Sequence, residues 1–271
     1  MLWQRSWRRP AVRRVFYEIL GLILLRRKGM QILNCGYRDA GLPAIPLAGE
    51  LEAERYGFQL YDRLAAAVPL AGADVLEVGC GRGGGARYLA DRFGPLSYSA
   101  TDSCLLFTVS NRLRARPGGP HFRLARSDTL PFPPCSFDIA IAVEAIHPLP
   151  DRDAFLAEMA RVLRPGGRLL VADFFYARES SPNALTAFRA AIGRSWFKVD
   201  LEEDWTRQAL AALESDSPRR LAEIRRLPRI FRKPALSFAC TAESPLYRQL
   251  LEGRAHYAHF ELSRRRTSAG C

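Results

Sequence analysis

A glycine-rich segment offers the first chemistry in this sequence. Glycines stand at positions 79, 81, 83, 84 and 85, directly after the mostly apolar run VLEV at 75–78 and before a helical pattern. Glycine lets the backbone approach a ligand closely, and the first N–H groups of the following helix then point at that ligand. The segment predicts a nucleotide-like ligand, and G-x-G-x-x-G at 79–84 keeps a dinucleotide open as the competing ligand.

Acidic residues follow the next two expected strands. Asp102 ends the strand expected over 96–102, where a carboxylate can hold two ribose hydroxyls, and Asp128 follows the strand expected over 121–126. A dinucleotide and other adenosine ligands share the need for Asp102. The loop after Asp128, the SFD that opens the next strand and the LRPGG before the fifth do not fit a dinucleotide domain.

His147 is the candidate general base. It follows the strand expected over 137–144, and an imidazole is largely neutral at pH 7, so it can accept a proton from a hydroxyl group. Glu144, three residues earlier, is placed to orient His147 or to contact the ligand. A histidine before a proline can also cap a turn, so a packing or binding role for His147 stays open.

The elements that position these residues predict an α/β fold. Short apolar runs alternate with amphipathic ones from Asp74 onward, which is typical of a parallel sheet with crossover helices. We expect strands over 74–79, 96–102, 121–126, 137–144 and 167–174, helices over 84–93, 103–114 and 151–163, and a turn at 165–167. Residues 180–230 predict helices throughout, placed as a substrate cap before two last strands at 235–241 and 255–262.

Over residues 74–174 the order of these motifs resembles the class I S-adenosylmethionine-dependent methyltransferases. The resemblance implies a Rossmann-like sheet of seven strands with the last one antiparallel, a helical lid region over 1–70, a cofactor-binding domain over 71–271 and S-adenosylmethionine as the cofactor. It also implies a set of cofactor contacts to the methionine, ribose and adenine parts: Glu77, Gly79, Cys80, Gly81, Gly83, Asp102, Ser103, Asp128, Thr129, Val143 and Tyr61.

A closer resemblance covers most of the chain. LNCGYRDAG at 33–41, GCGRGGGARYLA at 79–90, LPFPPCSFDIAIAVEAIHPLP at 130–150 and SPLYRQLLEGRAHYAHFEL at 244–262 look like the phthiotriol and phenolphthiotriol dimycocerosate methyltransferases. This implies O-methylation of a hydroxyl on a hydrophobic small molecule such as a lipid, polyketide or macrolide. Aromatic residues that the acceptor would then contact are Tyr17, Tyr37, Phe175 and Trp196.

Other functions stay open at this stage. Ile146, Pro148 and Leu149 depart from the closer pattern, which places small, polar or aromatic residues around this histidine, so the acceptor is not identified. A carbon methyltransferase of an isoprenyl diphosphate is the alternative. An RNA methyltransferase and a non-catalytic binding protein have less support.

The net charge and the N-terminal apolar run indicate which partners the protein could bind. The formal net charge of +12 suggests an anionic partner, but no stretch interleaves aromatic and basic residues, so we expect no nucleic acid. The apolar run at 15–25 contains Glu18 and is shorter than the roughly 20 residues that span a bilayer. It predicts either a helix over the substrate pocket or a basic amphipathic helix on a membrane surface.

The six cysteines form no C-x-x-C pair. This pattern favours reduced thiols, a cytoplasmic protein with a second possibility of membrane association, and no metal site. The oligomeric state is left open.

Overall fold

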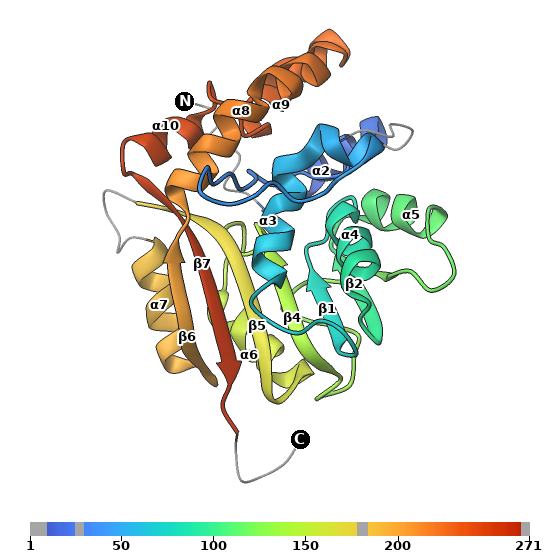
Figure 1. Cartoon of the computed structure of the whole chain (residues 1–271), viewed down its shortest axis with the longest axis vertical. Coiled ribbons are helices and arrows are strands. Elements are labelled where there is room, and N and C mark those ends of the chain that lie inside the picture. The colour runs from blue at the N-terminus through green and yellow to red at the C-terminus, as the bar shows by residue number, and fades with distance from the viewer. Residues whose placement is uncertain (1–9, 25–29, 178–183, 267–271) are drawn as a thin grey trace.

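The computed structural model describes residues 10–24, 30–177 and 184–266, and its centre is one seven-stranded sheet (Figure 1). The strand order is β3-β2-β1-β4-β5-β7-β6. The strands are β1 (Asp74–Val78), β2 (Ser97–Asp102), β3 (His121–Leu124), β4 (Phe137–Val143), β5 (Leu163–Tyr176), β6 (Phe197–Asp204) and β7 (Ala255–Arg264). Strand β7 is antiparallel to both β5 and β6, whereas the pairings from β3 to β5 are parallel, which confirms the predicted fold class.

Helices cover both faces of the sheet because successive residues of a strand point to opposite faces. Val75 and Ile141 join a core with α3 (Arg55–Ala65), α4 (Gly84–Phe93), α8 (Thr206–Arg225) and α10 (Pro245–Leu251). Leu76 and Ala140, their neighbours in sequence, join a second core with α6 (Arg152–Val162) and α7 (Ala184–Arg194). Strands β1 and β4 are mostly apolar on both sides because both faces are buried, and Glu77 is the buried exception in β1.

The expected elements of residues 74–163 are present, but the C-terminal part departs from the prediction. Strand β6 lies inside 180–230, which was predicted to be helical throughout, and 235–241 is not a strand because α9 (Arg229–Phe238) occupies most of it. Strand β6 is an edge strand whose middle is exposed and charged, so it lacks the alternation that marks a half-buried strand. The turn predicted at 165–167 lies within β5, where the pairing with β4 shifts register.

The helices α8, α9 and α10 therefore form the insertion before β7. Figure 1 shows α8, α9 and α10 gathered toward the edge at which the parallel strands end, with α3 running down in front of the sheet below them. The carboxyl ends of β1, β2 and β4 meet at this edge. Glu144, which follows β4, lies near Cys240 of the insertion, whereas Cys104, which follows β2, lies beside Tyr17.

Helix α2 (Pro10–Leu24) packs on α5 (Leu105–Leu113). The carboxylate of Glu18 accepts hydrogen bonds from the backbone N–H groups of Leu105 (2.8 Å) and Leu106 (3.1 Å) at the start of α5. Gly21 allows the close approach, since a Cβ atom there would lie 2.8 Å from the Cβ of Leu106. The one acidic residue of α2 thus satisfies the N-terminal donors of α5.

The structure also tests the expectations about the cysteines and about a membrane-spanning helix. Cys35, Cys80, Cys104 and Cys240 are free, whereas Cys135 is disulfide-bonded, which departs from the expectation of reduced thiols throughout. Within the described ranges, no helix combines the length and the apolar character that crossing a bilayer requires.

Candidate active site

Glu77 lies under the glycine loop at the end of β1. It is fully buried, and its two carboxylate oxygens accept hydrogen bonds from the hydroxyls of Tyr61 (2.8 Å) and Tyr98 (2.9 Å). Burial raises the pKa of Glu77 to about 7, although the two tyrosine hydroxyls act in the opposite direction. The phenols thereby fix the position of the carboxyl group below the loop.

The loop itself bends through left-handed backbone at three glycines. The φ angles are +73° at Gly79, +51° at Gly81 and +69° at Gly83, a region that side chains disfavour. A Cβ at Gly79 would lie 2.6 Å from Ala145, and one at Gly83 would lie 2.7 Å from Phe122, so these two positions are closed by packing. A Cβ at Gly81 would only reach ordinary van der Waals contact, 3.8 Å from Cδ1 of Leu33, so packing does not close this position.

Asp102 ties this loop to the end of β2. Its carboxylate accepts hydrogen bonds from the N–H groups of Gly81 (2.7 Å) and Cys104 (2.8 Å). Burial raises the pKa of Asp102, and the negative charge of Glu18 on α2 adds to that effect, while the N–H donors oppose it. Ser103, the next residue, is exposed.

The other expected cofactor residues lie around the same edge. Asp128 pairs with Arg126 (Nε to Oδ1, 2.8 Å), which lowers the pKa of Asp128, and Thr129 beside it is exposed. Cys80 and Val143 are buried, at the loop and at the end of β4. The structure thus brings the loop, Asp102 and the end of β4 to one edge of the sheet.

His147 is held by a carboxylate that the sequence reading did not select. Its Nδ1 lies 2.9 Å from Oδ1 of Asp173 on β5, and its backbone N–H donates to Oδ2 (2.9 Å). A carboxylate can only accept, so Nδ1 carries the proton and the lone pair of Nε2 stays available. The ring stacks on Phe174 with 4.0 Å between the centroids, and the side chain is 21% exposed. This arrangement orients a base that solvent or a ligand can reach.

Asp173 is fully buried and accepts two further hydrogen bonds, from the N–H groups of Ile146 (2.6 Å) and Phe174 (2.7 Å). A signal for it exists in the sequence, because an aspartate in the apolar run LLVADFF is unusual for a buried strand. What the sequence could not give was the partner, since β4 and β5 meet only in the sheet.

Glu144 does not hydrogen-bond to His147. Its carboxylate oxygen Oε1 accepts from the N–H of Cys35 (2.6 Å) and from the hydroxyl of Tyr257 (3.0 Å). Burial raises the pKa of Glu144, and its backbone is left-handed, with a φ of +49°. Glu144 therefore joins the N-terminal segment, β4 and β7, and it does not orient the histidine.

The four aromatic residues expected at the acceptor do not lie together. Phe175 is fully buried between Phe188 and Phe260. Tyr37 is buried against Trp205, with ring centroids 4.9 Å apart. Both side chains point into the core, so we leave them out of the acceptor site.

Trp196 lies at the opposite edge of the sheet. It precedes β6, whose first residue pairs with Arg264 at the end of the antiparallel β7, and its indole is 58% exposed. The position of Trp196 in the sequence could not show at which edge of the sheet this end of β6 lies.

Tyr17 is half-buried on α2, and its carbonyl lies 3.4 Å from Sγ of Cys104, beside Asp102. Of the four aromatic residues, only Tyr17 stays near the candidate site.

Tyr61 reaches Glu77 because α4 presents a glycine to it. An alanine Cβ at Gly85 would lie 2.1 Å from the Tyr61 ring. We expect Gly85→Ala to destabilise the protein by about 1–3 kcal/mol. Gly193→Ala in α7 is the matched control, because a Cβ there meets nothing within 4 Å. It should stabilise the protein by about 0.5–1 kcal/mol, and equal effects in urea denaturation would contradict this packing argument.

The raised pKa of Glu77 predicts a pH dependence of stability. Between its ordinary value near 4.5 and about 7, the folded protein keeps a proton that the unfolded chain loses. The contribution of Glu77 to stability is therefore complete below about 4.5 and is lost as the pH rises through about 7. Glu77→Gln should flatten this fall in urea denaturation without cofactor, by an amount on the order of a few kcal/mol.

Glu158→Gln provides a control of the opposite sign. Arg161 lowers the pKa of Glu158, so this carboxylate stabilises the fold at higher pH and loses that contribution as the pH falls. Parallel pH profiles for the Glu77 and Glu158 variants would contradict the assignment.

The class of protein follows from the glycine loop, the acidic ends of β1 and β2 and the seven-stranded sheet. A family model described as "Methyltransferase domain" matches residues 76–171, which span the loop, Asp102, Asp128 and His147. The chain is a methyltransferase, and S-adenosylmethionine is its cofactor.

Sequence similarity to two mycobacterial enzymes shows to which methyltransferase family the chain belongs. The chain is 30% identical to the phthiotriol/phenolphthiotriol dimycocerosates methyltransferase of Mycobacterium leprae over 97% of this chain and 93% of that protein. It is 42% identical to a fatty-acid O-methyltransferase of Mycolicibacterium smegmatis, over 55% of this chain and 54% of that enzyme. The chain therefore belongs to the S-adenosylmethionine-dependent methyltransferase family that includes the phthiotriol/phenolphthiotriol dimycocerosates methyltransferases.

Solved structures share the fold at lower identity. The [4+2]-cyclase SpnF matches with a TM-score of 0.70 and 19% identity, over 94% of this chain and 95% of that one. The geranyl diphosphate C-methyltransferase of Streptomyces coelicolor matches with a TM-score of 0.63 and 17% identity, over 86% and 87%. Because the first is a cyclase by name, the fold alone does not determine the reaction.

Proposed function

We propose that this protein transfers the methyl group of S-adenosylmethionine to a hydroxyl group of a hydrophobic small molecule, in the manner of a lipid or polyketide O-methyltransferase. The observation that carries the proposal is the His147–Asp173 pair at the edge where β4 and β5 end. The names of the mycobacterial relatives, an O-methyltransferase of fatty acids among them, support it.

The residues present fit the cofactor. Gly81 has no side chain and is not closed by packing at the turn of the loop, and the Asp102 carboxylate lies beside it, where it can accept hydrogen bonds from ribose hydroxyls. Glu77 below the loop and Asp128 after β3 border the ends of the same site. Bound there, S-adenosylmethionine supplies an electrophilic methyl group.

His147 supplies what a hydroxyl acceptor needs. A neutral hydroxyl is a weak nucleophile, and Nε2 can accept its proton while Nδ1–H donates to Asp173. The imidazolium that results is stabilised by the Asp173 carboxylate. Phe174, stacked on the imidazole, and Tyr176, whose ring centroid lies 5.4 Å from that of Phe174, give this part of the site an apolar wall.

We assign α2 and α3 to the lid region of residues 1–70 and α8–α10 to the substrate cap. These helices gather with residues 31–37 over the carboxyl edge of the sheet, so an acceptor would enter between them. The cap in this assignment begins later than the predicted 180–230, because β6 and α7 belong to the sheet and its far face.

The function is tested by incubating the reduced protein with S-adenosylmethionine carrying a labelled methyl group and a panel of hydroxylated lipids and polyketides. Label in an ether linkage of an acceptor supports the proposal. Calorimetric titration should show binding of S-adenosylmethionine but not of NADPH. A folded protein that binds neither S-adenosylmethionine nor its demethylated product would overturn the methyl-transfer assignment.

The α2–α5 pair also favours contact with an anionic membrane. Val15, Ile19 and Leu22 are exposed on one face of α2, and Leu105, Val109 and Leu113 are exposed on α5 beside it. Basic residues stand at 13, 14 and 26–28, before and after the apolar part of α2. An exposed apolar stripe between basic clusters is the pattern of a helix that lies in the membrane interface.

We expect the protein to bind vesicles that contain phosphatidylserine and to be released by salt. Leu22→Ser, at a position 63% exposed on α2, should weaken vesicle flotation, because one buried side chain contributes about 1.5–3 kcal/mol. Leu96→Ser, at a 74% exposed position before β2, is the control and should leave flotation unchanged. Equal flotation of both variants and the wild type would contradict membrane contact through α2.

A further inference from the structure

Three side chains with metal-ligand chemistry meet beside the candidate acceptor site. Sγ of Cys35, Sγ of Cys240 and a carboxylate oxygen of Glu144 all lie within 4.8 Å of one another. Cys35 precedes α3, Cys240 follows α9 and Glu144 follows β4, so the group exists only in the folded chain. Both cysteines are buried and free.

The ligand positions are held by the surrounding backbone. The Glu144 carboxylate is oriented by the N–H of Cys35 and the hydroxyl of Tyr257. Glu144 and Cys240 have positive φ angles of +49° and +40°, which cost energy for residues other than glycine. Such strain persists only where the surrounding structure holds it, as it does around ligand sites.

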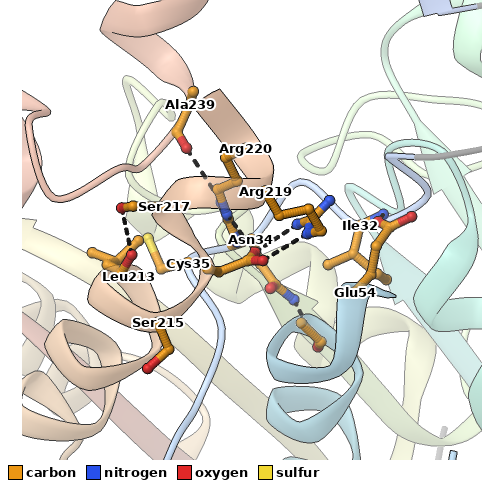
Figure 2. Close-up of polar contacts among 12 residues, drawn as sticks. Ile32, Asn34, Cys35, Glu54, Leu213, Ser215, Ser217, Arg219, Arg220 and Ala239 are labelled. Carbon is orange, nitrogen blue, oxygen red and sulfur yellow. Dashed lines mark hydrogen bonds and ion pairs between the residues drawn. The ribbon is translucent and has the colours of Figure 1, made fainter. Parts of the chain in front are cut away.

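A buried ion pair between Arg220 and Asp216, with the partly exposed Arg219 beside it, lies next to the two cysteines. Figure 2 shows that the guanidinium of Arg220 contacts two separate segments of the chain. It donates hydrogen bonds to the carbonyls of Asn34 (2.8 Å) and Ala239 (3.3 Å). These two residues directly precede Cys35 and Cys240. Arg219 and Arg220 both pair with Asp216, at 2.5 and 2.7 Å. Two arginines and one aspartate leave one positive charge at this place.

The net positive charge of the arginine group would balance the charge of the cysteine and glutamate ligands with a metal ion bound. Two thiolates and one carboxylate carry three negative charges, and a divalent ion reduces them to one, which the arginine group then balances. A buried charge without such compensation would be costly. Thiolate ligands favour Zn²⁺ over Mg²⁺ or Ca²⁺, which prefer oxygen ligands, and three protein ligands leave a fourth position for water.

We propose that Cys35, Glu144 and Cys240 form a binding site for Zn²⁺ or a similar thiophilic divalent ion. The ion joins residues 31–37, the end of β4 and the junction of α9 and α10, and so closes the lid and the cap over the active site. The site does not depend on which acceptor is methylated.

The test uses the full chain, fully reduced and stripped of metal, titrated with Co²⁺. We expect thiolate-to-cobalt absorption bands that saturate at one ion per chain. Zn²⁺ should displace the bands and raise the melting temperature, since a ligand that binds only the folded state stabilises it. The paired variant Cys35→Ser/Cys240→Ser should lose both the bands and the thermal shift.

Cys104→Ser is the control, because this cysteine is also buried and free but lies outside the group. It should retain the bands. Wild-type protein without thiolate bands at stoichiometric Co²⁺, or bands that persist in the paired serine variant, would overturn the proposal. Binding of S-adenosylmethionine, measured on the same samples, verifies folding and separates this result from the proposed methyl transfer.

Discussion

His147→Ala is expected to lower kcat for the hydroxyl acceptor by about 10²- to 10⁴-fold while leaving the Kd for S-adenosylmethionine unchanged. The reason is that the proposed mechanism makes Nε2 the proton acceptor and assigns cofactor binding to the glycine loop and Asp102, which do not contact His147. The measurement is the turnover of labelled methyl groups at saturating cofactor, beside a calorimetric Kd for each variant. Added imidazole should restore part of the lost rate.

Two comparison variants separate catalysis from packing. His256→Ala removes a half-buried histidine at the start of β7 and should leave kcat nearly unchanged. Asp173→Asn should lower kcat as well, because the amide no longer fixes the proton on Nδ1 of His147, and it should also lower stability, since Asp173 accepts hydrogen bonds from three backbone N–H groups.

An unchanged kcat in His147→Ala would contradict the base assignment. It would favour an acceptor that loses its proton without an imidazole, such as the alkene carbon of an isoprenyl diphosphate. Loss of S-adenosylmethionine binding together with kcat would instead show that His147 maintains the site's structure.

The second large effect is expected at Asp102. Asp102→Ala should raise the Kd for S-adenosylmethionine by about 10- to 100-fold, because hydrogen bonds to a charged group contribute about 1.5–3 kcal/mol. The variant also frees the N–H groups of Gly81 and Cys104, so the loop loses one of its attachments to β2, while Gly79 and Cys80 still donate to the carbonyl of Thr101. Calorimetric titration of wild type and variant at one salt concentration is the measurement.

Asp102→Asn and Asp91→Ala complete this experiment. The asparagine keeps one acceptor for the loop and should give an intermediate Kd. Asp91 pairs with Arg116 on the surface, with its side chain 54% exposed, so its removal should leave the Kd unchanged. A Kd for Asp102→Ala equal to that of the wild type would mean that the ribose hydroxyls bind elsewhere.

The cofactor half of the molecule could be predicted from the sequence because its signals are local. A strand, a glycine turn and a helix follow one another within residues 74–93, and the observed α4 has the predicted bounds of 84–93. Asp102 falls at a strand end for the same reason: the alternating segment SYSAT at 97–101 forms the strand that Asp102 ends. Such local patterns can be interpreted without knowing which elements pack against them.

The C-terminal part was harder to predict because its elements depend on neighbours. Strand β6 pairs only with β7, almost sixty residues later, and its exposed charged residues give no strand signal of their own. Residues 235–238 lie in α9, and their alanine and leucine are good helix formers, so residue propensity did not support the strand predicted there. At β6, by contrast, pairing with a neighbouring strand overrides the local pattern.

The sequence by itself determined the fold class, the glycine loop, Asp102 and the candidate base His147, since each is marked by residue types within one short segment. Only the tertiary structure decided that Asp173 orients His147, that Glu144 turns toward Cys35 and Tyr257, and that Trp196 lies at the far edge of the sheet. The physical reason is that these relations join strands and loops distant in the chain, and strand pairing and burial establish them after folding.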